Sequence, residues 1–230
     1  MKISSRSTGA AVLISLSMLM SNAFAAKLSK EVEERMSHDG LQQIKLKEVD
    51  LAYARPGASL AGYSKVILDP VEVSFSKYWD PKRTGSNFKL SNEEREDIRS
   101  GMATIVQEEF AKTLQAKEGY PLVKGAGPDV LRVKVSIIDL YVNAPDTLAA
   151  GRTRTYVASA GEATLVAELR DSETGQVLAR MVDRREARNF PGQLTWSNRV
   201  MNAQEAEIMA SAWAKVLRKS LDKAHEIGKK

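Results

Sequence analysis

A single hydrophobic stripe predicts a long helix between Ser91 and Gly119. Apolar residues recur at roughly every fourth position there, which places them on one face of a helix. Ser91 followed by Glu94 is the sequence of a capping box, and Gly119 is expected to end the helix in a left-handed conformation. The buried stripe comprises Ile98, Met102, Val106, Phe110 and Leu114.

A second helix is predicted near the C-terminus, over residues 202–227. Asn202, with Glu205 three positions later, is expected to cap its start. A helix of this kind packs one stripe of side chains against the rest of its domain. This stripe comprises Ala206, Met209, Trp213, Val216, Leu217 and Leu221.

The other hydrophobic segments alternate with polar residues or form short β-branched runs, as strands do. Pro70 interrupts the first of them, so this strand is expected at a sheet edge or with a bulge. The sequence Asp-Ser-Glu-Thr-Gly-Gln at 171–176 predicts a hairpin turn, because its glycine can adopt positive φ. The predicted strands cover residues 65–75, 120–123, 130–142, 161–170 and 177–186.

The order β-α-β-β-β-β-α predicts an α+β fold, with an antiparallel-rich sheet of about four to five strands and two long helices packed on one face. Residues 63–230 are expected to form this single domain. Residues 26–62 are polar and weakly periodic. We interpret them as an N-terminal leader with a short helix over 30–36 and an extended piece around 44–51.

The first 25 residues have the pattern of a cleavable secretory signal peptide. Lys2 and Arg6 precede an apolar run over 9–20, and Ala-Phe-Ala at 23–25 fits the small-x-small pattern before a cleavage site. An apolar run of about a dozen residues is too short to span a bilayer, which needs roughly 20. The chain has no cysteine to accept a lipid anchor. We therefore expect export to the periplasm and a mature chain without a transmembrane segment.

Removal of the signal peptide also changes the charge balance. Without Lys2 and Arg6, 32 basic side chains face 29 acidic ones, so the net charge falls from +5 to +3. So small a surplus is not the footprint of a nucleic-acid-binding protein. The lack of cysteine excludes disulfides, thiolate nucleophiles and thiolate-bound metals.

Side chains suited to catalysis are few. His38 lies in the leader and His225 near the end of the last helix, and neither has a carboxylate at ligand spacing. Asp69 and Asp139 are candidate acid–base groups for a hydrolase. The favoured alternative is that Asp69 braces the turn at Pro70 and Asp139 ends its strand. No catalytic residue, cofactor or metal is predicted.

Aromatic residues in two predicted loops are candidates for partner contacts. Tyr78 and Trp79, with Arg83 nearby, lie in the loop 76–89, and Trp196 lies in a second loop. Large aromatic residues beside basic ones are typical of interface hot spots. Each indole can equally fold back onto the core at the end of the sheet. The sequence leaves both interpretations open.

Arginines form a second candidate surface. Arg180 and Arg184 share one face of the predicted hairpin, near Arg152 and Arg154 of the long connection 143–156. Such a face would suit an acidic partner, an anionic lipid or a cell-wall polymer. The favoured alternative is a solvated sheet face with one cross-strand ion pair. The expected register pairs Asp171 with Gln176 and Glu162 with Arg185.

Five segments in a fixed order carry a family resemblance: 63–73, 90–91, 127–133, 168–179 and 183–185. Together they resemble a bacterial envelope family known as domain of unknown function thirty-three thirteen, over nearly the whole mature chain. The resemblance implies an exported protein, often a lipoprotein, with no assigned reaction. This chain departs from the common pattern because it lacks the lipid-acceptor cysteine.

These observations predict a non-catalytic binding or adaptor domain of the periplasm. Its expected partner is another envelope protein or an anionic envelope component. The alternative is a protein that binds a lipid headgroup or a cell-wall polymer, and a carboxylate-dependent hydrolase is the least favoured.

Overall fold

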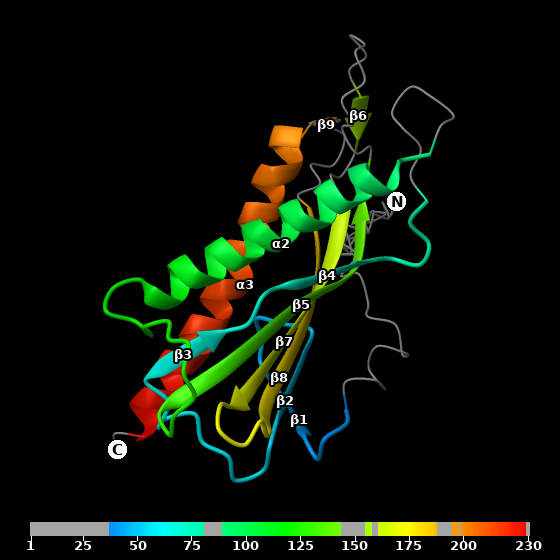
Figure 1. The fold of residues 1–230 in the computed structure, drawn as a ribbon. Helices are drawn as coiled ribbons and strands as arrows, with labels where there is room; N and C mark the ends of the chain where they lie inside the picture. Colours follow the sequence, from blue (N-terminus) through cyan, green and yellow to red (C-terminus); the bar gives the residue numbers. More distant parts are fainter. Residues whose placement is uncertain are drawn as a thin grey trace, which may run out of the picture.

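The computed structural model describes residues 37–80, 89–143, 155–157, 161–187, 195–197 and 199–228. They form a mixed, mostly antiparallel sheet with two helices on one face, which confirms the predicted α+β class (Figure 1). The predicted signal peptide and the helix expected over 30–36 lie outside the described residues. The elements are β1 (Gln42–Ile44), β2 (Leu51–Ala54), β3 (Lys65–Leu68), β4 (Glu72–Phe75), α2 (Asn92–Gln115), β5 (Val130–Val142), β6 (Thr155–Val157), β7 (Gly161–Asp171), β8 (Val177–Glu186), β9 (Thr195–Ser197) and α3 (Arg199–Gly228).

The main sheet has more strands than the sequence predicted. Its order over the described residues is β1-β2-β8-β7-β5-β3, with β4 also pairing with β5, which makes seven strands. Two of them, β1 and β2, come from the segment interpreted as a leader and extend the sheet from β8 in antiparallel pairs. Pro70 divides the predicted first strand into β3 and β4. Both run parallel to β5, because α2 crosses over before β5 begins.

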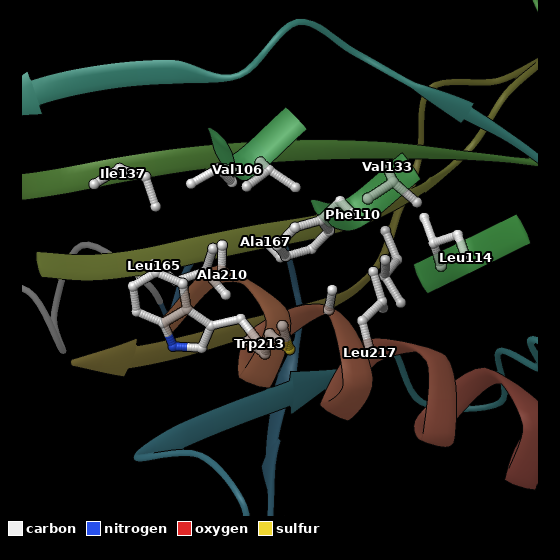
Figure 2. Close-up of a cluster of buried hydrophobic side chains, with 14 of the residues drawn as sticks. Val106, Phe110, Leu114, Val133, Ile137, Leu165, Ala167, Ala210, Trp213 and Leu217 are labelled. Carbon is white, nitrogen blue, oxygen red and sulfur yellow. The ribbon is translucent and has the colours of Figure 1, made fainter. Parts of the chain in front are cut away.

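The main hydrophobic core lies between the sheet and the two helices (Figure 2). The predicted stripes of both helices face this core, with Ile98 and Val216 partly buried and the others buried. Alternate residues of β5 and β7 supply the opposite side of the core. Side chains that meet there include Val106, Phe110, Leu114, Val133, Ile137, Leu165, Ala167, Ala210, Trp213 and Leu217.

The starts of the two helices differ in how well the sequence located them. The capping box of α2 is present, since Ser91 Oγ accepts from the Glu94 amide at 3.2 Å and Glu94 Oε2 accepts from the Ser91 amide at 2.7 Å. The predicted start of α3 at Asn202 is wrong, because the helix begins at Arg199. Residue 202 therefore lies inside the first turns of α3 and does not cap it.

A side chain of α3 closes the C-terminal end of α2. Arg218 donates through Nη1 to the Leu114 carbonyl oxygen at 3.0 Å, a group that the helix itself leaves unpaired. The prediction that Gly119 ends the helix is wrong, because positive φ falls on Lys117 and Glu118. Glycine is needed at 119 for space instead. A Cβ there would lie 2.0 Å from Arg218 Nη1 and 2.1 Å from the Leu114 carbonyl oxygen.

A second, smaller core covers the opposite face of the sheet. It forms where the N-terminal strands lie against β7 and β8, from Leu41, Leu51, Tyr53, Val166, Val177 and Val182. Arg55 adds a hydrogen bond from Nε to the Val177 carbonyl oxygen at 2.8 Å. The N-terminal segment is thus part of the folded sheet.

The predicted hairpin of β7 and β8 is present, but its register differs. The Asp171 amide donates to the Gln176 carbonyl oxygen at 3.0 Å, as expected for the turn. The register then shifts within the first pairs, so Glu162 lies opposite Glu186. The predicted pair of Glu162 with Arg185 is therefore wrong, because one bulge displaces every later pair by one position.

Candidate binding cleft between the two helices

A bulge near the end of β5 shapes one end of the sheet. Asp139 has a φ of 53°, and the pairing with β7 changes register just after it. Across from the bulge, Gly161 has a φ of 149°, and a Cβ there would lie 2.2 Å from the Tyr141 carbonyl oxygen. Only glycine fits this close approach. Bulges bend a strand and redirect the side chains that follow, and here Leu140 and Val142 line a cleft.

The cleft has a volume of about 680 Å³ and lies between the N-terminal halves of α2 and α3, over this end of the sheet. This size falls within the range of roughly 300–1,000 Å³ that is usual for ligand sites. Gly101 of α2 lies on its wall, and a Cβ at this position would have no atom within 4 Å. The apolar surface of the cleft comes mainly from Ile98, Met102, Ile105, Leu140, Val142 and Met209.

Carboxylates are the charged groups of the cleft. Glu94 and Asp97 come from α2, Glu162 from β7 and Glu205 from α3, and among the described lining residues there is no lysine, arginine or histidine. Two of the four have structural partners: Glu94 completes the capping box of α2, and Glu162 pairs with Arg184 at 2.5 Å. The mouth of the cleft is therefore acidic.

Arg184 shows the same excess of negative charge from outside the cleft. Its hydrogen bond to Glu162 raises its pKa, and the nearby charges of Asp139 and Glu186 act in the same direction. One arginine thus stands among three carboxylates at this end of the sheet.

Trp79 belongs to the core and does not form an exposed contact. Only 5% of it is exposed, its ring stacks on Phe75 with centroids 4.1 Å apart, and its Nε1 donates to the Val142 carbonyl oxygen at 2.9 Å. Arg95 of α2 lies over the other side of the ring. Trp79 thereby supports both the start of α2 and the end of β5. Tyr78, in contrast, is 77% exposed.

The two neighbouring aromatic residues allow a matched test. Trp79→Phe keeps the ring stack but leaves the buried Val142 carbonyl without its donor, so we expect the free energy of unfolding to fall by about 1–2 kcal/mol. Tyr78→Phe should leave it unchanged. Urea denaturation followed by circular dichroism measures both. Equal stability of the two variants would contradict the role given to Trp79.

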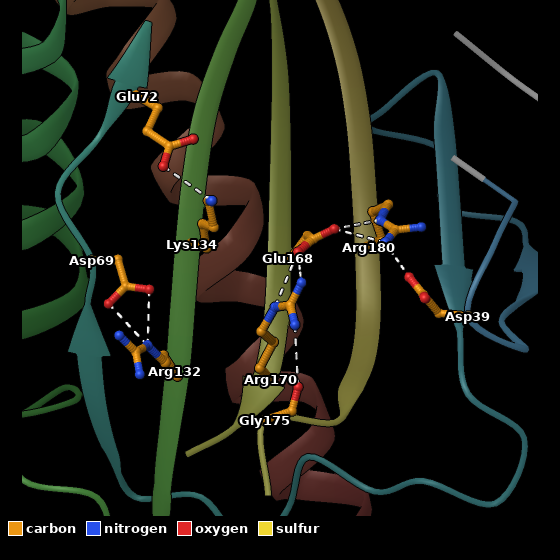
Figure 3. Close-up of polar contacts among 9 residues, drawn as sticks. All are labelled: Asp39, Asp69, Glu72, Arg132, Lys134, Glu168, Arg170, Gly175 and Arg180. Carbon is orange, nitrogen blue, oxygen red and sulfur yellow. Dashed lines mark hydrogen bonds and ion pairs between the residues drawn. The ribbon is translucent and has the colours of Figure 1, made fainter. Parts of the chain in front are cut away.

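The arginines of the hairpin are paired within the protein (Figure 3). Arg180 is only 6% exposed and lies between Glu168 and Asp39, with both contacts at 2.7 Å. Arg170 contacts the same Glu168. Along the neighbouring strands, Asp69 pairs with Arg132 and Glu72 with Lys134. Opposite charges thus alternate over this sheet face, and Arg180 and Arg184 do not form a separate basic surface.

The remaining predicted contact residues lie beyond the description. Arg83, Arg152 and Arg154 are outside the described residues. Trp196 is placed by its backbone alone, in β9, where it pairs with Tyr156 of β6.

The two candidate catalytic carboxylates are held apart by their environments. Asp69 receives two hydrogen bonds from Arg132 Nε, at 2.9 and 3.0 Å. Asp139 occupies the β5 bulge, and neither residue lines the cleft. His225 Nε2 lies 2.8 Å from the Tyr63 carbonyl oxygen. No group of three or more potential metal ligands is found within the described part of the chain.

Sequence reasoning did not identify the cleft. Its residues had been assigned to helix faces and strand ends, and Glu205 to a helix cap. The one available signal was Gly101, an interior helix glycine that propensity alone does not explain.

Comparisons with known proteins identify a family but no activity. The family model DUF3313, described as a protein of unknown function, matches residues 33–217. No curated protein matches the sequence. A Xanthomonas campestris protein of family DUF330 is similar in structure, with 8% identity, 77% of this chain and 94% of that chain covered, and a TM-score of 0.41. The PelC dodecamer of Paraburkholderia phytofirmans gives 15% identity, 72% and 95% coverage, and a TM-score of 0.31.

At TM-scores this low, neither structural likeness bears on function. Over the described residues, no helix combines the length and apolar character needed to cross a bilayer.

Proposed function

The chain belongs to DUF3313, a family of proteins of unknown function, and from this premise we propose that it is a non-catalytic binding protein of the cell envelope. Export rests on residues 1–25, whose sequence has the order of charges, apolar residues and small residues found in signal peptides. The cleft between α2 and α3 is the proposed binding site.

The open apolar space beside Gly101 is the observation that carries this proposal. A glycine in a helix interior costs about 0.5–1 kcal/mol relative to alanine. Here that glycine adds open volume to the wall of a cleft whose floor is hydrophobic. Apolar surface exposed in a concave site is typical of ligand and partner binding.

Binding of an anionic envelope component is supported less well. The arginines on which that interpretation depended, Arg180 and Arg184, are paired with carboxylates of the same sheet. The cleft itself presents carboxylates.

A neutral dye that fluoresces in apolar surroundings, N-phenyl-1-naphthylamine, tests the site. We expect the mature protein to bind it and Gly101→Trp to weaken binding at least about tenfold, because the indole fills the cleft. Gly101→Ala should bind as the parent protein does and should raise the free energy of unfolding by about 0.5–1 kcal/mol.

Glu108→Trp provides the matched control, since Glu108 is an exposed residue of α2 that does not line the cleft. Its dye binding should be unchanged. Unchanged binding in a folded Gly101→Trp variant would refute the proposed site.

A further inference from the structure

The positions of the cleft carboxylates narrow the chemistry of the ligand. They come from three separate elements, namely α2, β7 and α3, and so surround the apolar floor. An apolar centre with a charged rim is the usual layout of a surface that binds another protein. Negative rim charge favours a positively charged partner and disfavours an anionic one.

We propose that the cleft docks a basic amphipathic peptide segment of a partner protein. Its apolar side chains would occupy the space beside Gly101 and Met209, and its lysines or arginines would meet the rim carboxylates. This is the way in which an amphipathic segment lies in a hydrophobic groove. The inference rests on the proposed function, because it concerns the same site.

The spacing of the rim charges is the reason to choose a peptide over a single-headed amphiphile. Carboxylates on both walls and on the sheet match several basic groups distributed along one chain, whereas one headgroup meets only one part of the rim. Anionic lipid is disfavoured by the same charges.

Asp97 and Glu205 are the carboxylates to change. Glu94 caps α2 and Glu162 holds Arg184, so changing either alters the fold as well as the charge. Glu96 and Glu207 supply the control, since they lie on the same two helices and are exposed but do not line the cleft.

The probe is a pair of synthetic peptides of about 14 residues with identical leucine positions, one with lysine and one with glutamate at the polar positions. Binding to the mature chain is followed by displacement of N-phenyl-1-naphthylamine. The lysine peptide should bind at least about tenfold more tightly than the glutamate peptide, and a rise in salt should weaken it. The double variant D97N/E205Q should weaken it at least about fivefold, and E96Q/E207Q should leave it unchanged.

Equal binding of the two peptides would overturn the inference. The proposed function would survive that result if Gly101→Trp still excluded the dye, so the two failures are distinguishable. Displacement of the dye by phosphatidylglycerol vesicles and not by the lysine peptide would identify a lipid and also overturn it. So would self-association of the parent protein that Gly101→Trp abolishes, since the occupant would then be a second copy.

Discussion

Replacing Trp213 with alanine should lower the free energy of unfolding by about 4–5 kcal/mol, near the top of the range for large-to-small changes in a core. Trp213 is the largest of the fully buried side chains and lies between α3 and the sheet. Its Nε1 donates to Asp183 Oδ2 at 2.8 Å. The substitution therefore leaves both a cavity and a buried carboxylate with one donor fewer. Urea denaturation at neutral pH measures the loss.

Trp213→Phe separates the two effects. It retains most of the ring but removes the donor to Asp183, so we expect a loss of about 2 kcal/mol. Lys215→Ala, at an exposed position of the same helix, should change little. A loss in Trp213→Ala no larger than that in Lys215→Ala would contradict the central position assigned to the indole.

The pH dependence of Trp213→Phe follows from Asp183. Burial raises the pKa of Asp183, opposed by hydrogen bonds from Arg185 and Trp213. Loss of the Trp213 donor raises this pKa further. Because the folded pKa exceeds the unfolded value of 3.8, the ionised carboxylate costs stability above the folded pKa, and this cost disappears as pH falls toward 3.8. The deficit of Trp213→Phe should therefore shrink on acidification.

Arg180→Met should lower the free energy of unfolding by about 3–4 kcal/mol, because it removes one partner of a buried ion pair. Arg180 donates to Glu168 from the strand beside it and to Asp39 from the N-terminal segment. Methionine fills much of the space of the arginine stem, so the loss reports mainly the ionic contacts. Lys65→Met provides the control, since its pair with Asp129 is exposed and should contribute little.

Acidification provides a second measurement for Arg180→Met. Burial alone would raise the pKa of Glu168, but hydrogen bonds from Arg170 and Arg180 lower it below its usual value. The stability that this gives is present above the unfolded value of 4.5 and is lost as pH falls through the lowered folded pKa. Arg180→Met removes part of the lowering. The difference between parent and variant should thus narrow below about pH 4.5, and a difference independent of pH would contradict the ion-pair role.

Sequence pattern located the elements that are long and strongly periodic. The stripe of α2 and the alternation in β5 each extend over enough residues to specify a buried face, and the capping box depends only on Ser91 and Glu94. The strands β1 and β2 were not predicted, because they span only three and four residues and their partner β8 lies far along the chain. Parallel pairing of β3 and β4 with β5 is likewise set by tertiary contacts.

The cleft depends on features that local pattern does not encode. It forms where two helices and a bulged strand meet, and the residue in the bulge is Asp139, which takes positive φ although it is not glycine. The burial of Trp79 was undecided because the same loop sequence is compatible with a core contact or an exposed one. Asp183 gave a usable signal, since strand alternation places it on the same face as the buried Met181.

The N-terminal strands have a consequence for the timing of folding. Asp50 donates from its amide to Asp183, 133 positions later, and Arg180 reaches Asp39 across 141 positions. A segment that enters or leaves a compartment first would therefore wait for almost the whole chain before it found its partners. Contacts of such long sequence separation form slowly, because the intervening loop must close first. For a chain exported N-terminus first, closure of the sheet would be among the last steps, and the protein would stay incompletely folded during translocation.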